Sequence, residues 1–391
     1  MASALVIALA LAVGGCGSDD SSHSDTEPAV PIDQLDVGNY PTQPTQLGAV
    51  KNQTQARLVE AERLANFVPL AMDIDSRFVI GAPFVSTVWT LPEVSLGKIM
   101  NVDRFAEAAP DFVGGVTSFG STERNNRGID LANAVMIFPD EQKATAAAAA
   151  LEKVDFEAND RNAPVGIPKY PDAHAHWWPE RQSIGSWYAT GKYVVYTWIY
   201  DYKKIYLNKV DQPTLVALVE KSLDTVVPAI AKFTPTPVDQ LMNAQFDLDG
   251  MLARTLPRPR DDSWLNPPGA YNAHAAVLFD EDQAESRKHL EEAGVDRFAV
   301  EGTQLYRTRD AAAAKLLQST RGGLTKKFKS RAAPRNLPAA NCQEYIGREA
   351  LAVRFYCSVH YDRYAAFSWS EQLLDAQQRI SAQYALLENA K

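Results

Sequence analysis

The sequence has few of the residues on which enzyme active sites and nucleic-acid-binding surfaces depend. Its 391 residues include three cysteines and six histidines, and the formal net charge is −9. It contains neither the G-x-S-x-G motif of a serine nucleophile nor a phosphate-binding Walker loop. Basic residues cluster once, at Lys326, Lys327, Lys329 and Arg331. We therefore expect no nucleic-acid partner, and we expect no cofactor.

Apolar runs long enough to span a bilayer are also missing, and the longest apolar run stands at the start of the sequence. Residues 2–13 are almost all apolar, roughly a dozen residues where ~20 are needed to span a bilayer. Two glycines, Cys16 and a polar, acidic stretch follow, an order that resembles the bacterial lipobox. We expect residues 1–15 to be a lipoprotein signal peptide and Cys16 to carry a palmitate-type lipid anchor on the extracytoplasmic face of the cell membrane. An uncleaved transmembrane anchor or an ordinary buried helix is the alternative. No Lys or Arg precedes the apolar run, as one does in a normal signal peptide.

The other two cysteines, Cys342 and Cys357, remain as a pair once Cys16 is assigned to a lipid. They flank a break between two extended runs, and an exported protein sits in a compartment that permits disulfides. We expect them to form a disulfide bond. A thiol nucleophile or a metal-binding pair is the alternative, but it requires reduced cysteines.

The length of the chain predicts two domains, because a single hydrophobic core rarely serves so many residues. Residues 16–50 are rich in Ser, Asp, Pro, Thr and Gln, which predicts a flexible, disordered tether. An N-terminal α+β domain is expected over residues 51–232. Prolines concentrate in residues 233–269, which we interpret as a linker, and residues 270–391 form the expected C-terminal α+β domain.

Within the N-terminal domain, hydrophobic periodicity alternates between helix and strand patterns. The first helix carries Leu58, Glu62 and Ala65 on one side, and a later helix should kink or end at Pro228. Helices are expected at 55–68, 102–108, 141–154 and 211–228, and strands at 113–119, 129–138, 187–189 and 193–202.

The C-terminal domain shows a similar pattern. Residues 272–294 can be aligned with residues 133–154, which predicts a strand followed by a helix, and residues 298–318 are interpreted as an inserted hairpin and helix. Strands are expected within 351–369, before a helix that Ser368 and Glu371 should cap. The predicted fold class is α+β, with two related modules, each a mainly antiparallel sheet packed against helices. A shared pattern without duplication is the alternative.

Two histidines form the one candidate metal site. His174 and His176 are an H-x-H pair between Asp172 and Glu180, and on a strand both imidazoles would face one side, as zinc sites need. Because Pro168, Pro171 and Pro179 surround them, we interpret the pair primarily as part of a loop. A metal site is the second interpretation.

Aromatic residues give the most suggestive candidate binding surface. Alternate positions of one strand place Tyr196, Trp198, Tyr200 and Tyr202 on a single face, and Trp177, Trp178 and Trp187 precede it. Such side chains can form a platform for a glycan or a lipid, because they combine a large apolar area with a polar tip. Core packing beneath the helix at 214–227 explains the same pattern and is the first interpretation.

The segment LDVGNYPT at residues 35–42, followed by the helical segment QARLVEAERLANFV at 55–68, resembles a group of actinobacterial cell-envelope lipoproteins. These proteins contain a domain of unknown function, and the resemblance extends over nearly the whole mature chain. It implies an anchored, extracytoplasmic protein. It implies no catalytic residues.

These observations favour a membrane-anchored lipoprotein that binds an envelope lipid, glycan or peptidoglycan fragment without catalysis. Its expected partners are therefore the membrane, through Cys16, and an envelope molecule or protein. A scaffold or accessory subunit of a cell-envelope complex is the second hypothesis. A metal-dependent hydrolase that uses His174 and His176 is the third.

Overall fold

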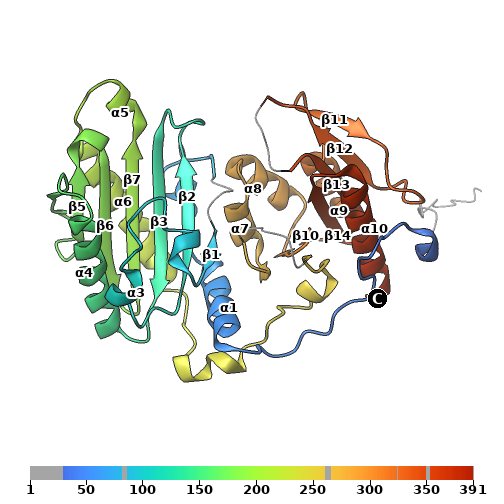
Figure 1. Ribbon diagram of the computed structural model, residues 1–391, viewed down its shortest axis with the longest axis horizontal. Helices are drawn as coiled ribbons and strands as arrows, with labels where there is room; N and C mark the ends of the chain where they lie inside the picture. Colours follow the sequence, from blue (N-terminus) through green and yellow to red (C-terminus); the bar gives the residue numbers. More distant parts are fainter. Residues whose placement is uncertain (1–29, 82–85, 260–265, 324, 349–352, 391) are drawn as a thin grey trace, which may run out of the picture.

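A computed structural model describes residues 30–81, 86–259, 266–323, 325–348 and 353–390. Cys16 and the expected signal peptide lie outside the described residues. Two antiparallel sheets of seven strands each stand next to one another, one from each half of the chain (Figure 1). The predicted α+β class is therefore confirmed. Within the described residues, no helix has the length and apolarity to cross a bilayer.

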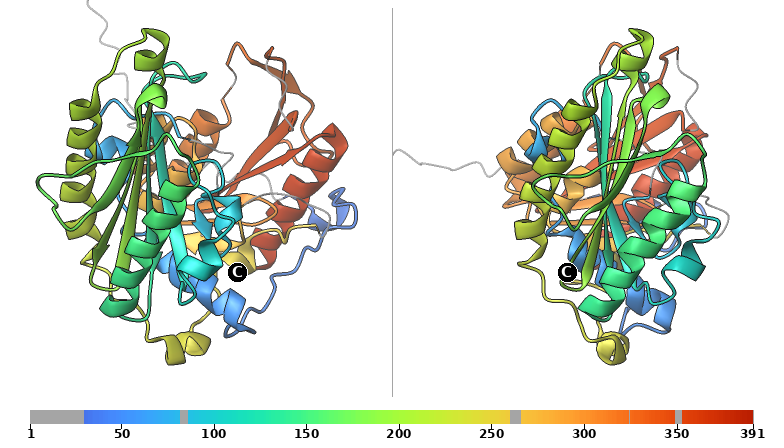
Figure 2. Two further views of the ribbon diagram at one scale, coloured as in Figure 1. Left: turned by 60° about the vertical axis from the view of Figure 1, so that its left-hand side comes forward. Right: turned by 90° about the vertical axis from the view of Figure 1, so that its left-hand side faces the viewer.

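The first sheet lies between two long helices, α4 and α6, on opposite faces (Figure 2). Along β7, Val195 and Ile199 pack with α6, whereas Val194 and Tyr196 pack with α4, as the two-residue period of a strand requires. The strand order is β1-β2-β3-β7-β6-β5-β4. The strands are β1 Val88–Trp89, β2 Gly114–Ser121, β3 Ile129–Ile137, β4 Ala163–Pro164, β5 His174–Trp178, β6 Ser183–Thr190 and β7 Tyr193–Asp201. The helices are α1 Gln53–Ala65, α2 Ala71–Ile74, α3 Phe105–Ala108, α4 Glu141–Glu157, α5 Tyr202–Tyr206 and α6 Gln212–Ile230.

Helix starts in this half follow the capping pattern of the sequence. The side chain of Asp140 accepts from the Lys143 N–H at 2.8 Å, and that of Asp211 accepts from the Thr214 N–H. Pro228 does not end α6, because the helix continues to Ile230. Only two residues of the helix, Ala229 and Ile230, follow this proline.

The second sheet has the order β8-β9-β10-β14-β13-β12-β11 and lies between α9 and α10. Cys342 in β12 pairs directly with Cys357 in β13, and the expected disulfide between them is confirmed. The strands are β8 Gly269–Tyr271, β9 Arg297–Val300, β10 Gln304–Arg307, β11 Phe328–Arg331, β12 Asn341–Tyr345, β13 Phe355–Tyr361 and β14 Tyr364–Ser370. The helices are α7 Ala273–Ala276, α8 Gln283–Glu292, α9 Ala311–Arg321 and α10 Leu373–Asn389.

The two sheets share one topology. Each strand of the first sheet has a counterpart in the second sheet whose number is higher by seven, from β1 and β8 to β7 and β14. Helix α9 corresponds to α4, and α10 corresponds to α6. Asp310 caps α9 as Asp140 caps α4. The two modules are therefore related, as predicted.

The alignment on which that prediction rested was nevertheless wrong. Residues 273–279 form α7 and a 3-10 turn, not a strand. A short, uniformly apolar run cannot be distinguished as strand or buried helix by its period. The segment interpreted as an insertion, residues 298–318, includes β10 and most of β9 and α9, which are the true counterparts of β3, β2 and α4. The predicted capping box is also wrong, because Gln372 is the N-cap of α10 and Ser368 lies within β14.

Residues 30–42 are packed along α10 and residues 45–50 lie against residues 244–253, so the predicted tether is wrong for this segment. Leu35 is buried in the core of the second module. The Tyr40 hydroxyl donates to Asp375 at 2.5 Å, and the Asn389 amide donates to the Thr42 carbonyl at 2.8 Å. The overall composition of this segment is polar, but a few spaced apolar side chains are enough to hold it against a helix.

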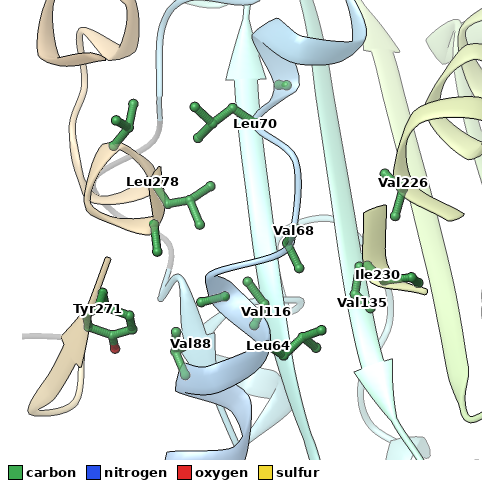
Figure 3. Packing of buried hydrophobic residues seen from close by; sticks show 14 of the residues in the cluster. Leu64, Val68, Leu70, Val88, Val116, Val135, Val226, Ile230, Tyr271 and Leu278 are labelled. Atoms are coloured by element: carbon green, nitrogen blue, oxygen red, sulfur yellow. The ribbon is translucent and has the colours of Figure 1, made fainter. Parts of the chain in front are cut away.

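Helix α1 joins the two modules. It contacts β1 and β2 of the first sheet and β8 of the second. Figure 3 shows Leu64 and Val68 beside Val116, with Tyr271 approaching from β8. The segment 233–269, expected as a linker, packs its 3-10 turn at Val238–Asn243 against α1. A single hydrophobic cluster therefore extends through both modules.

Candidate functional site

The predicted histidine pair lies on a strand, β5, and not in a loop. The surrounding prolines flank the strand without interrupting its hydrogen bonds. His174 is exposed, whereas His176 is buried and stacks on Trp187 with 5.6 Å between the ring centroids. His176 Nδ1 lies 3.2 Å from Glu152 Oε1, and its Nε2 lies 3.5 Å from Asp155 Oδ2.

These contacts give His176 a structural role. Both carboxylates belong to α4, so the imidazole ties β5 to the helix that covers it. Burial raises the pKa of Asp155, and the neighbouring His176 opposes that shift. Across the residues that the structure describes, no group of three His, Cys, Asp or Glu side chains is placed to hold a metal ion. The structure therefore gives the metal hypothesis no ligand set.

The aromatic face is divided between core and surface. Tyr196 and Trp187 are fully buried and stacked, with 4.2 Å between their centroids, and the Tyr196 hydroxyl donates to the Ile99 carbonyl. They pack with residues of α3 and α4. The helix expected to cover them, α6, lies on the opposite face, because the odd-numbered positions of β7 point toward it.

The other aromatic residues do not form one platform. Trp198, Tyr200 and Tyr202 are half-buried and in contact in series, with centroid distances of 5.7 Å for the stacked first pair and 4.4 Å for the tilted second pair. Trp177 and Trp178 are successive residues of β5 and so point to opposite faces. The structure thus separates Trp177 from the remaining rings.

A pocket of about 380 Å³ opens where α1, the segment 236–248 and β8 meet. Its walls come from both modules and from the segment between them. Glu62, Arg63 and Asn66 line it from α1 and the residue that follows, Phe246 lines it from the middle segment, and Ala270 lines it from β8. Clefts between modules are a common place for ligand sites, and this volume falls within the usual range.

Glu62 is the unusual residue of this pocket. It is 4 % exposed, and the backbone N–H of Ala270 donates to its carboxyl group. Among the described residues its Oε1 has no hydrogen-bond partner. Burial, with a smaller contribution from the charge of Asp247, raises the pKa of Glu62 well above its usual value. This shift favours the protonated carboxyl, which can both donate and accept a hydrogen bond.

A second polar atom without a partner lies beside it. The hydroxyl of Tyr271, in β8, is buried and makes no hydrogen bond to any described residue. A Cβ placed on Gly269 would lie 2.4 Å from this hydroxyl and 2.8 Å from Glu62 Oε1. Glycine is required at this position, because any side chain would displace both groups. One unsatisfied polar atom from each module therefore lies at the same point, next to the pocket.

The rim of the pocket is close to neutral. Arg63 Nη1 lies 2.6 Å from Glu60 Oε2, and Glu60 also accepts from the Thr236 N–H. The remaining polar groups are mostly side-chain amides, among them Gln240 and Asn243. The pocket thus offers neutral hydrogen-bonding groups together with the apolar ring of Phe246.

Sequence reasoning missed this site. The signal available was Glu62 itself, a carboxylate on the same side of a predicted helix as Leu58 and Ala65. A charged residue among apolar ones indicates burial, and a buried carboxyl is a candidate for function. Its neighbours in the pocket come from segments about 180 and 200 residues away, and only the fold brings them together.

The fold defines a two-module α+β protein with a pocket at the junction of its modules. Residues 47–246 match the family described as "Domain of unknown function (DUF7373) N-terminal", and residues 251–390 match its C-terminal counterpart. The matches cover most of the chain, and the protein belongs to this family. No curated protein matches the sequence.

Part of the chain is similar to a solved structure. It is the extracellular domain of PknH from Mycobacterium tuberculosis, with 13% sequence identity and a TM-score of 0.30. The similarity covers 48% of this chain and 99% of that one. A similarity of this strength bears on neither the ligand nor the activity of the present protein.

Proposed function

We propose that the protein is an extracytoplasmic lipoprotein of an actinobacterial cell envelope, anchored through Cys16, which binds an envelope molecule in the pocket around Glu62. The observation that carries the binding proposal is the buried Oε1 of Glu62, which has no partner among the described residues. Buried polar groups are nearly always hydrogen-bonded, so an unsatisfied one beside a pocket is a candidate ligand contact.

The chemistry of the pocket favours a neutral, hydroxyl-bearing ligand. A protonated carboxyl donates and accepts, as a sugar hydroxyl does, and the amides of Gln240 and Asn243 have the same dual capacity. Phe246 offers an apolar surface for the carbon side of a sugar ring. Because Glu60 neutralises Arg63, the rim does not favour an anion. Among envelope molecules, we therefore favour a glycan or a glycan-bearing peptidoglycan fragment over a lipid.

Replacing Glu62 with leucine should weaken glycan binding by at least tenfold, because the central hydrogen-bonding group is lost (about 1.4 kcal/mol for each factor of ten). Glu62→Gln should stay within about threefold of wild type, because an amide still donates and accepts. Native mass spectrometry with a panel of N-acetylglucosamine oligosaccharides and muropeptides identifies the ligand, and calorimetry then measures the affinities.

Glu285→Leu is the matched control, since Glu285 is exposed on α8 and does not line the pocket. This variant should bind like wild type. Thermal unfolding identifies any variant that fails to fold. Equal affinity in wild type and in a folded Glu62→Leu variant would remove the pocket from the proposal, and binding of none of the probes would remove the glycan.

Replacing Cys16 with alanine should abolish covalent lipid labelling. Cells grown with a clickable palmitate analogue should yield labelled wild-type protein and an unlabelled Cys16→Ala variant, because an acyl chain can attach only through that thiol. Ser18→Ala, two residues further on, should be labelled like wild type. A wild-type protein without label would contradict the proposed anchor.

A further inference from the structure

A small helical turn carries three apolar side chains into solvent at one end of the first module. Tyr206, Leu207 and Val210 are 70%, 53% and 69% exposed. They belong to α5 and the turn after it, residues 202–210, here named the α5 tip, which projects at the top of Figure 1. Single exposed apolar residues are common on proteins, but a cluster on one projecting turn indicates a contact surface.

The turn is held by its own backbone. The N–H of Leu207 donates to the Lys203 carbonyl at 3.1 Å, and the N–H of Lys209 donates to the Lys204 carbonyl at 2.9 Å. Asn208 between them adopts a left-handed conformation with φ of 51°, which asparagine tolerates better than most residues. The apolar side chains are therefore presented by a defined structure.

Positive charge surrounds these apolar side chains. Lys203 and Lys209 are exposed, and neither forms an ion pair within the described part of the chain. Two of the nearby acids are already engaged, because Asp211 pairs with Lys204 at 2.6 Å and Asp201 accepts from the backbone N–H of Lys204. The α5 tip thus combines an apolar end with two cations.

The second module places similar chemistry at the same end of the molecule. Ile346, directly after β12, is 53% exposed, and its N–H donates to the Lys327 carbonyl. Arg348, two residues after Ile346, and Lys326, next to Lys327, are exposed. In Figure 1, α5 and the strands β11 and β12 all lie toward the top of the view.

We propose that this end of the protein docks on a bilayer that contains anionic lipid. Tyrosine, leucine and valine side chains are suited to the boundary between headgroups and acyl chains, and flanking lysines are attracted to lipid phosphates. A bilayer is favoured over a protein partner because two separate parts of the surface carry exposed apolar and basic side chains, a pattern that suits a broad and deformable anionic surface. The pocket around Glu62 adjoins α1 and residues 236–248, which lie toward the opposite end in Figure 1, so docking leaves it open.

Vesicle sedimentation tests this surface separately from the acyl anchor. Residues 17–391 lack Cys16 but contain every residue that the structure describes. This chain should bind vesicles of phosphatidylcholine with 30% phosphatidylglycerol at least tenfold more strongly than pure phosphatidylcholine vesicles, and added salt should weaken the binding. Leu207→Ser with Val210→Ser, and separately Lys203→Glu with Lys209→Glu, should each reduce binding at least tenfold.

Leu91→Ser with Leu374→Ser is the matched control, because these leucines are 62% and 57% exposed elsewhere. This variant should bind like wild type. A Tyr206→Trp variant should show a blue-shifted emission on the anionic vesicles and none on the neutral ones. Equal binding to both vesicle types, unchanged binding of either α5-tip variant, or self-association that Leu207→Ser abolishes would each overturn the proposal.

Discussion

Replacing Cys342 and Cys357 together with alanine should lower the free energy of unfolding by about 3 kcal/mol. The disulfide closes a loop of 15 residues between neighbouring strands, so it restricts the unfolded chain more than the folded one. Both cysteines are also buried against α10, and the loss of their sulfurs leaves a small cavity that acts in the same direction. Urea denaturation followed by circular dichroism measures the change, and the midpoint of thermal unfolding should fall by about 6–12 °C.

Reduction of the wild-type protein is the control for this prediction. A reducing agent should bring the wild type close to the double variant and leave the double variant unchanged. Both proteins should keep native secondary structure in the absence of denaturant, because the strand pair retains its backbone hydrogen bonds. An oxidised wild type that unfolds at the same urea concentration as the double variant would contradict the prediction.

Raising the pH from 5 to 8 should destabilise the native protein through Glu62. Burial raises the pKa of this carboxyl well above 4.5 in the folded state, so the folded protein retains a proton that the unfolded chain has released. Stability is then fully present below pH 4.5 and decreases as the pH rises toward the folded pKa, by up to about 1.4 kcal/mol per pH unit. Glu62→Gln, which cannot ionise, should lose this part of the pH dependence.

The difference between wild type and variant isolates Glu62 from other buried acids. Burial also raises the pKa of Asp130, to about 6, and that of Glu301, so each contributes a decrease of the same sign. These contributions cancel when urea unfolding of wild type and Glu62→Gln is compared at each pH. Glu285→Gln, on an exposed position, should follow the wild-type profile. Parallel profiles for wild type and Glu62→Gln would show that Glu62 is already ionised in the folded protein.

Patterns within short stretches of sequence predicted much of the fold. Asp140 and the alanine-rich segment after it defined α4, and the alternating aromatic residues of β7 defined a strand. The disulfide followed from the number and spacing of the cysteines. These features depend on neighbours within one element or one strand pair, which is the range over which periodicity and capping act.

Features that depend on distant packing were not predicted. The polar composition of residues 30–50 gave no sign of the contact between Tyr40 and Asp375, which are 335 positions apart. The aromatic face was assigned to α6, because nothing in the strand pattern shows which helix covers which side. The pocket was not predicted for the same reason, because Glu62 and Ala270 meet only when β8 packs on α1.

The position of α1 has a consequence for how copies of this protein behave at high concentration. Strands β1 and β8 end their sheets on the inner side, and α1 contacts both, so neither presents a free ladder to another molecule. The outer edge strands of the two sheets are β4 and β11. Strand β4 has only two residues, and one of them, Pro164, has no backbone N–H to donate. Strand β11 carries the charged side chains of Lys329 and Arg331. Strand addition and fibril growth are thereby discouraged at every margin formed by the fourteen described strands, even at high protein concentration.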